Sequence, residues 1–246
     1  MIKILAQTSQ QIQYLYHLSD IHIRNHSRHQ EYRHVFNKTY QLLNGEVKNN
    51  PPASGLIVIT GDIVHSKSQI SPQLIIELRD FLTSLCQIMP VIMIAGNHDL
   101  NLSNKNVPDT LTSILHKIEI PNLYYLKNSG IYQWNNIQFS VMSVLDYPLI
   151  RATEFPKNNQ PILKIGLLHA TLHGSKIATS QLPLTSDKYK ASDFDGYDAV
   201  LLGDIHLHQY MNQDLFESHG VMIDKFYFSP FHLEGTVKKY KKRSNC

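Results

Sequence analysis

The stretch GLIVIT at residues 55–60 is apolar along almost its whole length and is followed directly by Gly61 and Asp62. A run of this kind without alternating polar positions is typical of a central strand that is covered on both faces. The run VIMIA at residues 91–95 has the same character and leads into Gly96 and Asn97. The two runs predict central strands of a covered sheet, with polar residues where the strands end.

Further apolar runs of strand length alternate with amphipathic helical patterns on either side of this pair. The expected strands lie at residues 14–18, 137–144, 163–169 and 198–203, and the expected helices at 31–48, 72–88 and 109–118. Ser71 and Pro72 suit the N-cap and the first position of the second helix. Asn135 and Asn136 suit a hairpin turn between two strands. The alternation predicts an α/β layered domain.

The composition is that of an ordinary folded domain. The chain has 246 residues, of which 42% are hydrophobic and 17% charged, and its formal net charge of +3 does not by itself indicate a nucleic-acid partner. Its two cysteines, Cys86 and Cys246, predict no disulfide framework and a reducing compartment. We find neither a secretory signal nor an apolar run near the length of about 20 residues that spans a bilayer. We therefore expect an intracellular protein, in the cytoplasm, nucleoid or nucleus, that is neither secreted nor bound to a membrane.

Five clusters of metal-ligand residue types follow the C-terminal ends of apolar runs. They are Asp20 with His22, Asp62 with His65, Asn97 with His98 and Asp99, His169, and Asp204 with His206 and His208. Ligands of open α/β sheets bind at the carboxyl edge of the strands, so the clusters predict one site. Residues i and i+2 of an extended segment point the same way, which would let both members of a pair face one ion. This ligand set without thiolates suits two divalent ions, and manganese, iron and zinc are all chemically suitable.

The same residues resemble a known family. The motifs DIH (20–22), GDIVH (61–65), GNHD (96–99), LLHATLHG (167–174) and GDIH (203–206) occur in the order used by the calcineurin-like metallophosphoesterases. The resemblance runs from about Tyr14 to Gln209 and implies a layered αββα sandwich with a dinuclear metal site at the C-terminal ends of the strands. His65, three residues after Asp62, and the HIR run at 22–24 are similar to the SbcD/Mre branch, the nucleases of DNA double-strand break repair.

The resemblance also implies a role for each matching residue. One ion would be bound by Asp20, His22, Asp62 and His206, and the other by Asp62, Asn97, His169 and Asp204. His98 would contact the scissile phosphate and assist the leaving group, Asp99 would orient His98, and His65 would lie near the phosphate. Arg24 and His208 are candidate substrate contacts.

Position 204 is a departure from the family pattern, because most members have histidine there. A carboxylate at this position favours a hard divalent ion over zinc, so Mn²⁺ is the expected metal. The alternative ligand pair in this stretch is His206 with His208, which lies two residues farther from the strand end. We favour Asp204 with His206, and the alternative stays open.

The SbcD/Mre resemblance implies a metal-dependent phosphodiesterase, a DNA exonuclease or endonuclease acting in repair or recombination. DNA is the expected partner, and an SbcC-like ATPase is another, although no docking segment is visible in the sequence. A phosphoesterase for small molecules or nucleotides is the alternative, and a non-enzymatic metal scaffold is disfavoured because His98 serves chemistry. We expect a phosphoesterase domain over residues 1–235, with a closing strand within 226–240, and a basic tail over 236–246 in place of the family's capping domain.

Overall fold

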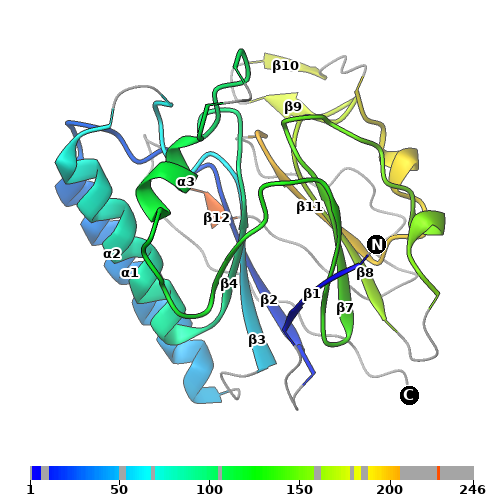
Figure 1. Cartoon of the computed structure of the whole chain (residues 1–246), viewed down its shortest axis with the longest axis horizontal. Coiled ribbons are helices and arrows are strands. Elements are labelled where there is room, and N and C mark those ends of the chain that lie inside the picture. Colours follow the sequence, from blue (N-terminus) through cyan, green and yellow to red (C-terminus); the bar gives the residue numbers. More distant parts are fainter. Residues whose placement is uncertain are drawn as a thin grey trace.

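The computed structural model describes residues 2–6, 11–49, 54–67, 70–104, 107–157, 162–177, 180–183, 188–205 and 226–227. Within these residues two five-stranded sheets pack against each other, and a layer of helices covers one of them (Figure 1). The strands are mostly parallel, so the expected α/β class is confirmed. No helix in the described ranges has both the length and the apolar character that crossing a bilayer requires.

The first sheet has the order β12-β2-β3-β4-β5 and is parallel throughout. Its strands are β12 (Phe226–Tyr227), β2 (Tyr14–Ser19), β3 (Gly55–Thr60), β4 (Val91–Ile94) and β5 (Leu123–Tyr125). The three strands expected at 14–18, 55–60 and 91–95 are therefore confirmed. β12 falls at the start of the expected closing strand, and the tail beyond it lies outside the described residues.

The second sheet has the order β1-β6-β7-β8-β11. Its strands are β1 (Lys3–Ala6), β6 (Gly130–Trp134), β7 (Ile137–Met142), β8 (Leu163–His169) and β11 (Ala199–Gly203). β6 and β7 form the expected antiparallel hairpin, with Asn135 in the left-handed region at φ 46°. A small separate sheet joins β9 (Lys176–Ile177) to β10 (Ser180–Pro183).

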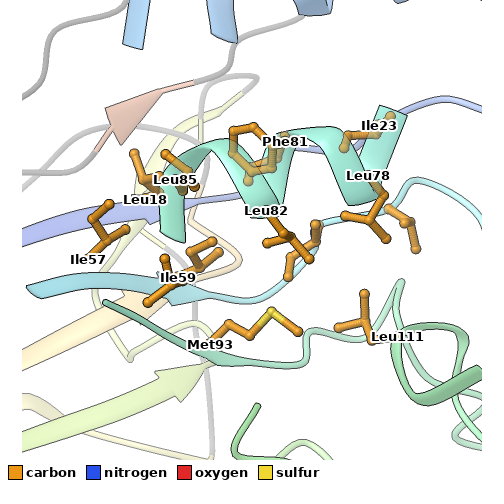
Figure 2. Close-up of a cluster of buried hydrophobic side chains, with 14 of the residues drawn as sticks. Leu18, Ile23, Ile57, Ile59, Leu78, Phe81, Leu82, Leu85, Met93 and Leu111 are labelled. Carbon is orange, nitrogen blue, oxygen red and sulfur yellow. The ribbon is translucent and has the colours of Figure 1, made fainter. Parts of the chain in front are cut away.

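Side-chain alternation along β3 explains why this strand is apolar throughout. Leu56 and Val58 belong to an inter-sheet cluster, which also contains Phe139, Val141, Ile165 and Leu167 of the second sheet. Ile57 and Ile59 point the other way into a helix-side cluster, where they meet Leu78, Leu82 and Leu85 (Figure 2). Both faces of β3 are thus buried, as the sequence predicted.

The helices that cover the first sheet are α1 (His29–Asn49), α2 (Pro72–Ile88) and α3 (Thr110–Leu115). Ser71 is the N-cap of α2, as expected, and its Oγ accepts the Leu74 N–H at 3.1 Å. α3 is shorter than the predicted 109–118, because Asp109 is its cap and Lys117 has left-handed φ of 56°.

In the part of the chain that the structure describes, no α-helix covers the outer face of the second sheet, where the αββα expectation implied a helical layer. Among the described residues, this face is covered by loops and by the short 3₁₀ helices η2 (Ala152–Glu154) and η3 (Ala191–Phe194). Phe155, Tyr189, Phe194 and Tyr197 pack there with Leu168 in an outer cluster. The described residues thus confirm two layered sheets and one helical layer, and the second α-helical layer stays a prediction. The connecting segments contain prolines, which interrupt helices, and their aromatic rings cover the sheet instead.

Candidate metal centre

Residues of both sheets meet at the carboxyl ends of the strands. Asp20, Asp62 and Asn97 follow β2, β3 and β4 of the first sheet, whereas His169 ends β8 of the second. Asp20, Asp62 and His169 are buried, and each offers a ligand atom within 4.8 Å of the others. Side chains that are distant in the sequence therefore form one group between the two sheets.

Asp62 stands at the middle of this group. Its Oδ1 lies 3.3 Å from His169 Nε2, and its Oδ2 lies 3.5 Å from His22 Nε2. The backbone N–H of His98 also donates to Asp62 Oδ1 at 2.9 Å. One carboxylate thus faces histidines on two sides, which is the placement a bridging ligand requires.

His169 Nε2 faces a second set of oxygen atoms. Asn97 Oδ1 lies 3.1 Å away and Asp204 Oδ1 lies 3.8 Å away. The other ring nitrogen, Nδ1, lies 2.8 Å from the backbone carbonyl of Thr60, which can only accept a hydrogen bond. Nδ1 therefore carries the proton, an arrangement that is typical of metal-binding histidines and aims Nε2 at the site.

The pKa values of this group reflect strong mutual attraction. Burial favours the neutral acid of Asp62, but hydrogen bonding and the charges of His169 and His22 outweigh burial and lower its pKa to about 2. Burial likewise opposes a charge on His169, yet Asp62, Asp20 and Asp204 raise its pKa to about 9. These carboxylates attract positive charge. A divalent ion bound at His169 Nε2 would take the place of the proton on that nitrogen.

The backbone at four of the candidate ligands lies in the left-handed region rather than the extended one. The φ values are 55° at Asp20, 51° at His22, 51° at Asp62 and 72° at Asp204. The premise that these residues lie in extended segments is therefore wrong. The loops after β2 and β3 instead run together, because the N–H of His22 donates to the Asp62 carbonyl at 2.9 Å and Ile23 bridges to Val64. This pairing stabilises conformations that cost about 1–3 kcal/mol each in isolation.

Glycines make the close approach of these loops geometrically feasible. A Cβ atom on Gly96 would lie 2.2 Å from Asp62 Oδ1. A Cβ on Gly203 would lie 2.1 Å from both Thr60 O and His169 Nδ1. At Gly96 and Gly203, atoms of neighbouring segments thus occupy the space that a side chain would need.

Three histidines form a second group on the more exposed side of the centre. His22, His65 and His98 each offer a nitrogen within 4.8 Å of the others, and the His22 and His98 ring centroids are 4.9 Å apart. His98 Nδ1 lies 2.7 Å from the His65 carbonyl oxygen. Partial burial and the charge of Arg24 lower the pKa of His65.

Asp99 has a different position from the one implied for it. Its buried carboxylate accepts hydrogen bonds from the backbone N–H groups of Ile63, Val64 and Gly96 at 2.8–3.2 Å. The Nδ1 atom of His98 contacts the His65 carbonyl and not this carboxylate. The expectation that Asp99 orients His98 directly is therefore corrected: Asp99 ties the loop after β3 to the loop after β4, because its oxygens satisfy amides of both.

Two supporting residues were not predicted from the sequence. The Thr60 carbonyl holds His169, and the Tyr32 hydroxyl donates to the His22 carbonyl at 2.7 Å. Neither carries a sequence signal, because every residue has a carbonyl and Tyr32 belongs to a helical pattern. The predicted His206 and His208 lie outside the described residues, so the choice between the two ligand pairs stays a prediction.

The donor set fits divalent cations. The carboxylates of Asp20 and Asp62 are 7% and 1% exposed, and like charges this close and this buried need neutralisation. Oxygen and imidazole donors are those that manganese, iron and zinc bind. The described residues that could hold metal around Asp62 are thus Asp20, His22, Asp62, Asn97, His169 and Asp204, and His22 also belongs to the histidine group with His65 and His98.

Comparison with known proteins agrees with this chemistry. A family model for calcineurin-like phosphoesterases, a generally dimetal-dependent family, matches residues 14–208. The chain is also 41% identical over 245 residues to "Uncharacterized protein R555" of Acanthamoeba polyphaga mimivirus, covering 96% of this chain and 18% of that protein. This chain thus spans a small part of the length of that viral relative. The chain belongs to the calcineurin-like phosphoesterase family.

Proposed function

We propose that this chain is a metal-dependent phosphodiesterase that cleaves DNA in the manner of the SbcD/Mre nucleases. Family membership supports hydrolysis of a phosphoester bond. The observation that carries the choice of DNA is the pair His65 and His98, whose rings stack at 5.6 Å on the solvent-facing side of the buried carboxylates. A polymer can reach an imidazole pair placed in this way without entering a closed pocket.

The proposed chemistry needs two divalent ions, Mn²⁺ by preference, which when bound would lower the pKa of a water molecule and stabilise charge on the phosphoryl oxygens. Asp20, His22 and Asp62, with His206, would hold the first ion. Asp62, Asn97, His169 and Asp204 would hold the second. The Asp204 carboxylate is the reason for preferring manganese over zinc.

His98 would give a proton to the departing oxygen. Its Nδ1 is occupied by the His65 carbonyl at 2.7 Å, so the protonated ring keeps that hydrogen bond and presents Nε2–H to the substrate. The backbone N–H of His98 donates to Asp62 Oδ1, which ties the proton donor to the central ligand. His65 stands beside this ring and would contact the phosphate.

Among the arginines of residues 24–33, Arg24 is the one that we expect to contact DNA. Arg28 forms an ion pair with Glu31, and Arg33 forms one with Glu77, so these two charges are partly neutralised within the protein. Arg24 instead acts electrostatically on His65 at the centre. A substrate phosphate next to His65 would meet this guanidinium.

The test is hydrolysis of single-stranded DNA, double-stranded DNA, bis-p-nitrophenyl phosphate and cyclic nucleotides, each with Mn²⁺, Mg²⁺ or Zn²⁺. We expect cleavage of DNA, fastest with Mn²⁺. Turnover of cyclic nucleotides with no cleavage of either DNA would reject the nuclease and establish the small-molecule alternative.

A salt titration tests the contact with DNA. Affinity for DNA falls as salt rises, because each neutralised phosphate releases counterions. Arg24→Ala should reduce the slope of log K against log salt by about 1, whereas Arg28→Ala, the matched control, should leave it unchanged.

An SbcC-like ATPase as partner and an intracellular compartment stay predictions of the sequence.

A further inference from the structure

We propose that Lys188, held over the ring of Tyr147 at the rim of the metal centre, binds a second phosphate of the substrate, next to the one that is cleaved. This inference rests on the proposed function, because the second phosphate in question is the next one along the backbone of a DNA strand. Neither residue belongs to the five sequence motifs.

The position of Tyr147 follows from the topology of the second sheet. β7 and β8 are parallel neighbours with Met142 opposite Leu168, so the loop after β7 leaves the sheet at the edge where His169 lies. Tyr147 is in this loop and packs against both the helix-side cluster and the outer cluster. Tyr147 therefore lies at the edge of the second sheet where His169 ends its strand, and it contacts clusters on the outer sides of both sheets.

The electrostatics agree with this placement. Burial raises the pKa of Tyr147, and the next contributions come from the negative charges of Asp204 and Asp62. The phenol is thus within electrostatic reach of the carboxylates on which the metal centre is built.

The backbone of Tyr147 is held in an uncommon conformation. Its φ is 46°, in the left-handed region, which bulky residues seldom adopt. Its N–H donates to the Ser143 carbonyl at 2.8 Å, which closes the turn. A conformation of this cost is kept by surrounding contacts, and strained positions of this kind cluster at functional sites.

Lys188 lies over this ring, although it belongs to a chain segment that is distant from Tyr147 in the sequence. Its Nζ lies 3.5 Å from the Tyr147 ring centroid, although the residue is exposed. The adjacent Tyr189 is buried, and its hydroxyl donates to the Pro148 carbonyl at 2.9 Å, so the two segments are bound to each other one residue further along.

An ammonium group positioned in this way is prepared to bind an anion. The ring attracts the cation and restricts a side chain that would otherwise sample many rotamers. The three N–H donors of an ammonium suit phosphate oxygens. Since His65, His98 and Arg24 all follow strands of the first sheet, Lys188 offers a cation on the second-sheet side, where the next phosphate of a bound strand would lie.

The experiment compares Lys188→Met, Lys188→Arg and the wild type with single-stranded DNA and with bis-p-nitrophenyl phosphate, in Mn²⁺. We expect Lys188→Met to raise KM for DNA about 10-fold, because one charged hydrogen bond is lost, with kcat within about twofold. Lys188→Arg should keep the wild-type KM. Hydrolysis of bis-p-nitrophenyl phosphate, which has a single phosphate, should not change in either variant.

Two further variants separate the subsite from a general effect of charge or packing. Lys3→Met is the matched control, because Lys3 is also exposed and lies 5.3 Å from the Tyr132 ring, and it should leave KM for DNA unchanged. Tyr147→Phe keeps the ring and should keep the wild-type KM for DNA. Tyr147→Leu should raise that KM, and the double variant with Lys188→Met should have the same KM as Lys188→Met alone. If Tyr147→Leu does not fold, the Lys188 variants alone decide.

The outcomes distinguish this inference from the proposed function. Wild-type cleavage of DNA with an unchanged KM in Lys188→Met overturns the subsite and leaves the nuclease intact. An equal loss on bis-p-nitrophenyl phosphate also overturns the subsite, since the lysine would then act at the scissile phosphate. Wild type that hydrolyses bis-p-nitrophenyl phosphate but not DNA overturns both.

Discussion

Asp62 and His169 belong to different sheets, yet Asp62 Oδ1 and His169 Nε2 are only 3.3 Å apart. Both residues are 1% exposed, so their separation is set by the packing of the two sheets rather than by either loop alone. The metal centre thus depends on the inter-sheet cluster beneath it, and changes that move one sheet against the other should act on metal binding.

Removal of divalent metal should abolish phosphodiester hydrolysis. Excess EDTA is expected to stop turnover of bis-p-nitrophenyl phosphate, and added Mn²⁺ should restore it. The melting temperature should also fall on chelation, because ligand binding to the folded state stabilises it and the buried carboxylates of Asp20 and Asp62 repel each other. Full activity in excess EDTA would show that the group is not a catalytic metal centre.

His98→Ala should lower kcat by about 10²–10⁴-fold while both metal ions remain bound. The reason is that only the ring is lost, whereas the backbone N–H that donates to Asp62 Oδ1 survives. Metal content by elemental analysis and kcat together make the measurement. Asn97→Ala is the matched control and should lose metal, because Asn97 Oδ1 lies 3.1 Å from His169 Nε2. If His98→Ala lost metal and Asn97→Ala kept it, His98 would be the metal ligand and Asn97 would not.

Asp99→Ala should lower the free energy of unfolding by about 3 kcal/mol, because it leaves buried backbone N–H groups without an acceptor. The carboxylate is fully buried and accepts from Ile63, Val64 and Gly96. Urea denaturation measures the change. A variant of unaltered stability that loses only kcat would favour a direct catalytic role for Asp99 after all.

Gly203→Ala should destabilise the fold by about 2 kcal/mol or more and weaken metal binding. The added methyl would lie 2.1 Å from both Thr60 O and His169 Nδ1. The hydrogen bond between these two atoms is the one that orients the histidine. Gly45→Ala is the control, since a Cβ there meets nothing within 4 Å and Gly45 lies inside α1. That change should stabilise the protein by about 0.5–1 kcal/mol. Thermal melts measure stability, and a Mn²⁺ titration measures metal affinity. If Gly203→Ala behaved like Gly45→Ala in both measurements, packing at Gly203 would be unimportant.

Asp109 should contribute stability that depends on pH. Burial opposes its ionisation, but hydrogen bonds from Lys127 and Thr112 outweigh burial and lower its pKa. A lowered pKa gives stability that is present above the carboxyl's unfolded pKa of about 3.9 and is lost as pH falls through the folded value. Asp109→Asn keeps a good N-cap but loses the charge. The wild type should thus be more stable than this variant at pH 7, and the difference should shrink toward pH 3. A difference independent of pH would contradict a stabilising ion pair between Asp109 and Lys127, whose Nζ lies 2.8 Å from Asp109 Oδ2.

The strands and the ligand types were readable from the sequence because both depend on local chemistry. A fully apolar run such as residues 55–60 has few alternatives to a doubly covered strand, and Asp62 after Gly61 is visible as a polar residue at its end. The helix that begins after Ser71 was predicted for the same reason, since capping is a short-range interaction. These features require no knowledge of which strand lies beside which.

Short and irregular elements were not readable in this way. β1 and β5 have few residues and gain stability from their neighbours, and the irregular cover of the second sheet depends on aromatic packing between separate segments. The tertiary structure also decided the role of Asp99, because its backbone partners come from two loops that nothing in the local sequence brings together.

The sequence by itself determined that carboxylates and imidazoles gather at the ends of parallel strands, because hydrophobic pattern and residue chemistry are local properties. Only the tertiary structure decided that the ligands come from two sheets, with Asp62 between His22 and His169. It also decided that Asp20, His22, Asp62 and Asp204 have left-handed rather than extended backbone. Both outcomes depend on how the inter-sheet cluster packs and on which backbone atoms meet Gly96 and Gly203, and such contacts exist only once distant segments of the chain have come together.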